Sequence, residues 1–405
     1  MESKPTLNIL LNGFEEIANI DGYDFFNEDV KQMLLGSATY LTQNSYYYNL
    51  CDINDYQQGE YYFFFPTHSL SYNDLLNYLE KNVLLFNLIT NYLNSNNVKV
   101  IFIDLHESHE KTEFIKFVNL FKNKNVNLDN LFIINNDSNL KEYTKELDFN
   151  ISVHKSEHLV VTSSGGFSKT PISFILDKPK FFLCLNNRAK AHRLGIVSWL
   201  KHFGMLEDSN ISYLSTNYYE EANIFFYLGT YLYKKLKNDI EYIHNNHPIL
   251  TDSEKIHNPD IVNNLHIVFA GLVDVRDYMN SYVNIVTESV FFSERIHITE
   301  KSVKPFAFFQ IPIFVASQNH VKTLREKYGF DMFDDIVNHE YDNEPNEQIR
   351  LQLVLNEIKR IYDNKTNIIQ FYKDNKERFV NNRKLIYELS KKTFDFDYFD
   401  KIKWK

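Results

Sequence analysis

Short apolar runs recur along the chain, separated by stretches of helical or polar character, and this recurrence limits the possible folds more than any other feature. The runs are rich in β-branched and aromatic residues. Such runs are typical of parallel strands that are covered by helices on both faces. We expect strands at 7–12, 61–66, 98–104, 131–135 and 158–163, and in a second series at 180–186, 211–215, 265–271, 283–288 and 311–317.

The length of the chain favours two consecutive α/β domains. Its 405 residues exceed the size at which one hydrophobic core keeps growing, and 44% hydrophobic content can fill two cores. Between the two series, glycines and prolines interrupt "TSSGGFSKTPISFILDKPK" at 162–180, which predicts an inter-domain connection. A phosphate loop is a poorer interpretation, because the G-x-x-x-x-G-K-[ST] spacing is absent.

The pattern of apolar residues in the sequence changes after residue 345. Apolar residues at helical spacing predict a long amphipathic C-terminal helix, with Leu351, Leu355, Ile358 and Tyr362 on one face. We therefore expect an N-terminal domain at 1–175, a second domain at 176–345 and a C-terminal helical segment at 346–405.

Net charge, apolar stretches and cysteines indicate which classes of protein this chain can belong to. The net charge of -10, with basic residues spread along the chain, argues against non-specific nucleic-acid binding. No apolar stretch is long enough for a membrane span, and the N-terminus lacks the pattern of a signal peptide. Cys51 and Cys184 lie far apart in apolar contexts, which predicts buried free thiols and a reducing, cytoplasmic location.

A basic loop follows one predicted strand in "CLNNRAKAHRLGIVSWLKHFG", residues 184–204. Arg188, Lys190, His192 and Arg193 stand between the strand end and an amphipathic helix. Anions bind favourably at helix N-termini and outside the carboxyl ends of parallel strands. Two interpretations stay open for this passage alone: a phosphate or pyrophosphate site, and a solvated loop whose cations contact neighbouring acids.

A second candidate is "NIVTESVFFSERIHITEK", residues 284–301. Glu288 follows a predicted strand, and Thr299 can cap a helix that carries Glu300 and Lys301 in its first turn. A carboxylate there suits a ribose diol or a sugar, and a lysine suits a phosphate. The alternative is that Glu300 complements the helix dipole and Lys301 is a surface cation.

Together the two passages resemble the donor-binding half of α-1,3-fucosyltransferases, a family of inverting GT-B glycosyltransferases. Asn187 and Arg193 keep the family's spacing, although Asn186 replaces its serine. "VTES" at 286–289, "HITEK" at 297–301 and "IPIFVAS" at 311–317 follow in the family's order. The chain departs from the family at Ser289, where the family has asparagine, and Pro305 falls in the second turn of the expected helix.

The block "LREKYGFDMFDDIVNHEYDN", residues 324–343, is similar to a passage in uncharacterised glycosyltransferase-like proteins of tailed phages and large DNA viruses. The resemblances cover about residues 180–350. They imply a GT-B fold, with two Rossmann-like domains facing a central cleft, and a cytoplasmic location, which for a viral protein is the host cytoplasm.

The resemblance also implies roles for single residues. It assigns Arg193 and Lys301 to the diphosphate, Glu300 to the donor ribose and Glu288 to the vicinity of the donor sugar. The full set of expected donor-binding residues is Asn187, Arg188, His192, Arg193, Glu288, Thr299, Glu300 and Lys301. The nucleoside-diphosphate sugar is a substrate, and the resemblance implies neither a cofactor nor a metal.

An inverting transfer needs a general base near the acceptor hydroxyl. "VKVIFIDLHESHE" offers Asp104 and Glu107 directly after a predicted strand, where they would line the cleft. These two are the expected catalytic residues, and "HKSEH" at 154–158 is a weaker candidate.

We therefore expect transfer of a sugar, GDP-fucose-like or other, to a hydroxyl on a glycan or protein. One alternative is modification of hydroxymethylated bases in viral DNA. Another is a protein that binds nucleotide sugars without turnover.

Overall fold

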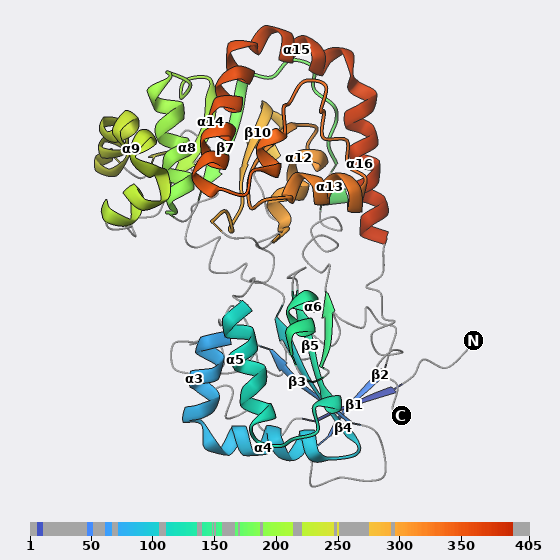
Figure 1. The fold of residues 1–405 in the computed structure, drawn as a ribbon. Helices are drawn as coiled ribbons and strands as arrows, with labels where there is room; N and C mark the ends of the chain where they lie inside the picture. Colours follow the sequence, from blue (N-terminus) through green and yellow to red (C-terminus); the bar gives the residue numbers. More distant parts are fainter. Residues whose placement is uncertain are drawn as a thin grey trace, which may run out of the picture. The chain divides into compact units, whose positions relative to one another are not determined.

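The computed structural model describes residues 6–10, 47–51, 61–66, 72–104, 111–135, 140–147, 149, 151–155, 167–168, 171–186, 189–213, 221–246, 249–250, 275–292 and 296–391. The chain divides into two compact units, Met1–His158 with Lys392–Lys405 and Leu159–Lys391 (Figure 1). Each unit is built of strands and helices, so the expected α/β class is confirmed.

The first unit contains a six-stranded parallel sheet. Its strands are β1 (Thr6–Leu10), β2 (Tyr47–Cys51), β3 (Tyr61–Pro66), β4 (Val98–Asp104), β5 (Leu131–Asn135) and β6 (Ser152–Lys155), and they lie in the order β2-β1-β3-β4-β5-β6. The predicted strands that match β1, β3, β4 and β5 are confirmed, and the one at 158–163 lies outside the described residues. β2 and β6 were not predicted, since "YYNLC" and "SVHK" are short and interrupted by polar residues.

Helices α3 (Tyr72–Lys81), α4 (Val83–Asn94), α5 (Lys111–Lys122) and α6 (Leu140–Tyr143) belong to the first unit. Helix α5 repeats apolar residues at helical spacing and buries Phe114, Phe117, Val118 and Phe121. Its Phe117 ring packs edge-on against Phe102 of β4, with 5.1 Å between centroids. In Figure 1, α3 lies beside α5, where Tyr72 stacks on Phe117.

The second unit contains a five-stranded sheet. Its strands are β7 (Lys180–Asn186), β8 (Ser209–Tyr213), β9 (Ile249–Leu250), β10 (Ser281–Thr287) and β11 (Ile311–Val315). They lie in the order β11-β10-β7-β8-β9, and only the short β9 pairs antiparallel. The four parallel strands were predicted, whereas the expected strand at 265–271 lies outside the described residues.

The order of strands reverses beside β7. From β7 the chain proceeds to β8 on one side, and later returns to place β10 on the other side. Such a reversal leaves a crevice at the carboxyl ends of the two central strands, because their following helices diverge to opposite faces. In this unit, the reversal lies between β7 and β10.

Helices α8 (Ala191–His202), α9 (Glu221–Asn246), α11 (Val275–Met279), α12 (Glu300–Ala307) and α13 (His320–Tyr328) accompany this sheet. Gly195 lets α8 approach α9 closely, because an added Cβ would lie 2.9 Å from a methyl group of Leu228. Helix α9 bends at Gly229, whose φ of 74° and ψ of 162° are open to glycine alone.

The predicted amphipathic C-terminal helix is α14 (Glu347–Asp363), and two further helices, α15 (Lys365–Asp374) and α16 (Lys376–Lys391), follow it (Figure 1). Asn364 and Asn375 separate them. Each asparagine side chain donates to the carbonyl four residues earlier, at 2.8 and 2.9 Å, and so competes with the helical backbone. The predicted apolar face is correct, since Leu351, Leu355 and Ile358 are buried in the core of the second unit.

Cys184 lies in the middle of β7 and is a buried free thiol, as predicted. Burial raises its pKa to about 12, although the Asn186 side chain and Arg193 oppose the rise. The side chain of Cys51 lies outside the described residues. No helix in the described part of the chain is long and apolar enough to cross a membrane.

Candidate functional site

The candidate site lies at the carboxyl end of β10, beside the reversal of strand order. Glu288 is the first residue after β10, and its backbone N-H donates to the carbonyl of Val315 at the end of β11. On the other side, Thr287 donates to the Asn186 side chain at the end of β7, with 2.6 Å between the oxygens. These cross-strand contacts fix the strand ends from which the site is built.

The Glu288 side chain is completely buried, so it requires several partners to remain charged. Its carboxylate accepts hydrogen bonds from the hydroxyls of Thr299, at 2.8 Å, and Ser302, at 2.5 Å. Burial raises the pKa of Glu288, but Lys301, His320 and the Ser302 hydrogen bond outweigh it and hold the pKa below its ordinary value. Glu288 is therefore ionised inside the protein and accepts hydrogen bonds from the residues around it.

Thr299 caps α12, as the sequence predicted. Its hydroxyl oxygen accepts a hydrogen bond from the backbone N-H of Lys301 at 3.2 Å. The same hydroxyl donates its proton to Glu288. Thr299 thus joins the first turn of α12 to the end of β10.

Glu300 and Lys301 form an ion pair in the first turn of α12, with 3.0 Å between Nζ and Oε1. Their side chains keep 18% and 30% of their exposure, so both can reach a ligand. Burial raises the pKa of Glu300, but Lys301 and Lys304 outweigh this effect and bring the pKa to about 2. Glu300 is therefore ionised at neutral pH.

Pro305 is buried within α12, and the helix continues through it to Ala307. Proline has no N-H and cannot donate to the carbonyl four residues earlier, which belongs to Lys301. The helix ends within one turn of Pro305, at the cap residue Phe308. The helix ends there because Phe309 lies in the left-handed region, with a φ of 55°, and the N-H of Gln310 donates to the Pro305 carbonyl at 2.8 Å.

His320, the first residue of α13, reaches the same cluster and was not predicted. Its Nε2 lies 2.8 Å from the hydroxyl of Ser302, and the ring is completely buried. Burial lowers the pKa of His320, against the opposing effects of Glu288 and Asp342, so the ring is neutral at pH 7. The sequence carried no signal for this contact, because "QNH" between a strand and a helix resembles an ordinary loop.

His192 and Arg193 bind the backbone of the β10 end. The Arg193 guanidinium donates to the carbonyl oxygens of Thr287 and Glu288 at 3.2 and 3.4 Å. The Nε2 of His192 lies 3.1 Å from the Glu288 carbonyl, and burial and neighbouring cations lower the His192 pKa well below its ordinary value. Both side chains are buried, so in this structure they fasten α8 to β10.

A stack of side chains supports this junction. The ring of Phe291 lies 5.3 Å from that of His192, and the guanidinium of Arg350 in α14 lies 4.9 Å from the Phe291 ring. Arg350 also donates to the Phe291 carbonyl at 2.9 Å. An arginine inside the apolar pattern of α14 is a sequence signal that could have identified this contact.

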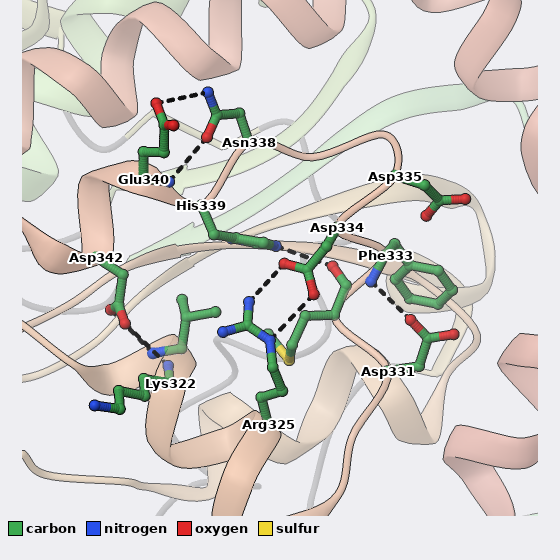
Figure 2. Close-up of polar contacts among 12 residues, drawn as sticks. Lys322, Arg325, Asp331, Phe333, Asp334, Asp335, Asn338, His339, Glu340 and Asp342 are labelled. Atoms are coloured by element: carbon green, nitrogen blue, oxygen red, sulfur yellow. Dashed lines mark hydrogen bonds and ion pairs between the residues drawn. The ribbon is translucent and has the colours of Figure 1, made fainter.

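The block at 324–343 stabilises the start of α13 (Figure 2). The Asp342 carboxylate accepts hydrogen bonds from the backbone N-H groups of Val321 and Lys322, at 3.0 and 2.9 Å. In Figure 2, Arg325 faces Asp334. The Nε2 of His339 lies 2.9 Å from the carbonyl oxygen of Met332. Asp342 thus serves as a helix cap from a distant segment.

The remaining predicted residues follow or end two strands. Asn187, Arg188 and Glu107 are outside the described residues, and Asp104 is the last residue of β4. Among the described residues, no group of three or more His, Cys, Asp or Glu side chains could hold a metal ion.

The site joins one buried carboxylate, one accessible ion pair and two helix starts. No family model matches this chain, and no curated protein matches its sequence. The interpretation of the site therefore depends on the geometry of its own residues.

Proposed function

We propose that the second unit binds the donor of an inverting GT-B glycosyltransferase, a nucleoside-diphosphate sugar. The observation that carries this proposal is the meeting of Glu288, Thr299, Glu300 and Lys301 beside the reversal of strand order. Nucleotides bind at such a crevice in open α/β sheets, where helix starts and cations face the phosphates.

Lys301 is the group that contacts the diphosphate. Its ammonium is held by Glu300 and by the Thr299 hydroxyl, at 3.0 and 3.3 Å, and it keeps a free side toward solvent. The Glu300 carboxylate accepts hydrogen bonds from the ribose hydroxyls. When the sugar leaves the nucleotide, Lys301 stabilises the negative charge that develops on the departing phosphate.

Arg193 and His192 support this site through the backbone. Because they fasten the carbonyls of Thr287 and Glu288, they hold the crevice floor in place. Asn187 and Arg188, which follow β7, complete the proposed set of donor-binding residues.

The acceptor binds to the first unit in this proposal. Asp104, at the end of β4, or Glu107 takes the proton from the acceptor hydroxyl. The acceptor oxygen then bonds to the anomeric carbon from the face opposite the nucleotide, while the bond from that carbon to the phosphate oxygen breaks. The products are an inverted glycoside and a nucleoside diphosphate.

Binding measurements test the proposal directly. Isothermal titration with GDP, UDP and their sugar conjugates should detect at least one ligand, and Lys301→Ala should weaken it about 10- to 100-fold through loss of a charge-assisted contact. Lys384→Ala is the matched control, because Lys384 is an exposed lysine of α16 outside the cluster.

Two results would count against the proposal. Absence of any nucleotide binding by the unmutated protein would remove its basis. Equal weakening by the Lys301 and Lys384 variants would exclude Lys301 as the phosphate contact. If a nucleotide sugar binds but is neither hydrolysed nor transferred, the protein is a binding module without turnover.

A further inference from the structure

A continuous chain of hydrogen bonds runs from α13 to α12 through Glu288. His320 contacts Ser302 at 2.8 Å, and Ser302 contacts the Glu288 carboxylate. The carboxylate in turn contacts Thr299, whose hydroxyl lies 3.3 Å from the Lys301 ammonium. His320 and Ser302 are both 0% exposed, so they act from behind the site.

The direction of every hydrogen bond in this chain is determined. An ammonium only donates and an ionised carboxylate only accepts. Thr299 accepts from Lys301 and must therefore give its single proton to Glu288. Ser302 must also donate to Glu288, which leaves its oxygen to accept a proton from Nε2 of His320.

We propose that Ser302 and His320 are positioning residues of the nucleotide-sugar site, which act through Glu288 and Thr299 to hold Lys301 toward the diphosphate. This inference depends on the proposed function. If Ser302 is lost, Glu288 loses a donor and more readily takes up a proton. If His320 is lost, Ser302 still donates to Glu288, but it no longer accepts a hydrogen bond that holds it in this orientation. A protonated Glu288 can donate to Thr299, whose hydroxyl then no longer has to point away from Lys301.

Other titratable groups surround Glu288 and also influence its ionisation. Lys301, Glu300 and Lys304 belong to α12, and His297 precedes that helix. Asp342 acts on His320 from the segment that caps α13. The Nδ1 atoms of His297 and His320 are buried without a hydrogen-bond partner among the described residues, which disfavours the charged form of each ring.

Four variants test the chain of hydrogen bonds. Ser302→Ala removes the link, His320→Leu removes the outer donor, His320→Gln keeps an N-H donor in place of Nε2, and Glu288→Gln removes the carboxylate charge. Each full-length variant is titrated with GDP and UDP from pH 8 to pH 5, and its melting temperature is measured in parallel.

We expect the unmutated protein to bind its preferred nucleotide with little change in Glu288 ionisation over this range. Ser302→Ala should bind about three- to tenfold more weakly at pH 7 and lose further affinity toward pH 5, since its hydrogen bond to ionised Glu288 is gone. His320→Leu should show the same changes to a smaller degree, since Ser302 keeps its hydrogen bond to Glu288 but loses the donor that orients it. His320→Gln should restore binding to within about twofold. Glu288→Gln, which has no charge at any pH, should bind weakly without this dependence.

Unchanged affinity and an unchanged pH profile in Ser302→Ala would overturn the inference, even if its melting temperature falls, because that result describes a purely structural contact. If His320→Leu does not fold, Ser302→Ala and His320→Gln decide the question. If the unmutated protein binds neither nucleotide, the proposed function fails instead, and the two failures are therefore distinguishable.

Discussion

The hydroxyl of Thr299 lies 2.8 Å from a carboxylate oxygen of Glu288, although 11 positions separate the two residues in the sequence. One residue caps a helix and the other directly follows a strand. The contact therefore fixes the first turn of α12 on the sheet. Because it involves a buried charge, it should contribute strongly to stability.

We expect Thr299→Val to lower the free energy of unfolding by roughly 1–3 kcal/mol, since it removes both the cap of α12 and a donor to Glu288. Urea denaturation measures this change. Thr299→Ser keeps the hydroxyl, so its free energy of unfolding should fall much less. Equal losses in the two variants would mean that the methyl group, and not the hydroxyl, stabilises the fold.

Asp342 offers a second test of a helix start. Asp342→Ala removes the acceptor for the Val321 and Lys322 N-H groups and should destabilise the protein by about 1–2 kcal/mol (Figure 2). Asp342→Asn retains one oxygen and should show a smaller loss in urea denaturation. Unaltered stability of Asp342→Ala would show that water replaces the carboxylate.

Two glycines with positive φ differ in backbone strain. An added Cβ at Gly204 would meet nothing within 4 Å, so Gly204→Ala should cost roughly 1 kcal/mol for its backbone alone. Gly229→Ala should cost more, because the φ and ψ of Gly229 are open to glycine alone, whereas the exposed Gln348 side chain, 2.7 Å from an added Cβ, can move away. Thermal unfolding of both variants measures the difference. A smaller loss for Gly229→Ala than for Gly204→Ala would contradict this account of the bend in α9.

Lys178 should make stability depend on pH. Its ammonium is buried against the carbonyls of Ser281 and Phe309, at 2.9 and 3.2 Å, and burial lowers its pKa from 10.5 to about 7. Between these two values the unfolded chain binds more protons than the folded one, so stability rises with pH. The gain is complete above pH 10.5 and is lost as the pH falls through about 7.

Urea denaturation at pH 7 and pH 9.5 measures this effect against Lys178→Met. The unmutated protein should gain roughly 1–3 kcal/mol relative to the variant between the two pH values. A constant difference between the two proteins would mean that the carbonyls and the Tyr372 ring, 4.7 Å from the ammonium, keep Lys178 charged.

The apolar runs were sufficient to predict most of the described strands, because a strand buried on both faces requires nearly continuous apolar sequence. β6 escaped prediction since "SVHK" lies at a sheet edge, where such a run is not required. The ends of α14 and α15 were not predicted either. They depend on hydrogen bonds of the Asn364 and Asn375 side chains, which the hydrophobic pattern does not report.

Only those contacts of the candidate site that join residues close together in the sequence could be predicted. The cap by Thr299 could be read from adjacent residues, and Glu288 could be placed at a strand end. The contacts of His320 and Asp342 join segments that are distant in sequence, so no local pattern predicts them. Arg193 was expected to face a ligand, whereas its guanidinium donates to backbone carbonyls, a partner that sequence does not specify.

The buried thiol of Cys184 makes β7 a natural reporter of how often the second unit opens. With a pKa of about 12, this thiol has almost no reactive thiolate near neutral pH while the unit stays closed. Alkylation at this position must then wait for an opening event, and its rate measures the frequency of that event. Because ligands slow opening, a nucleotide that protects Cys184 from alkylation would reveal its own binding without any enzymatic assay.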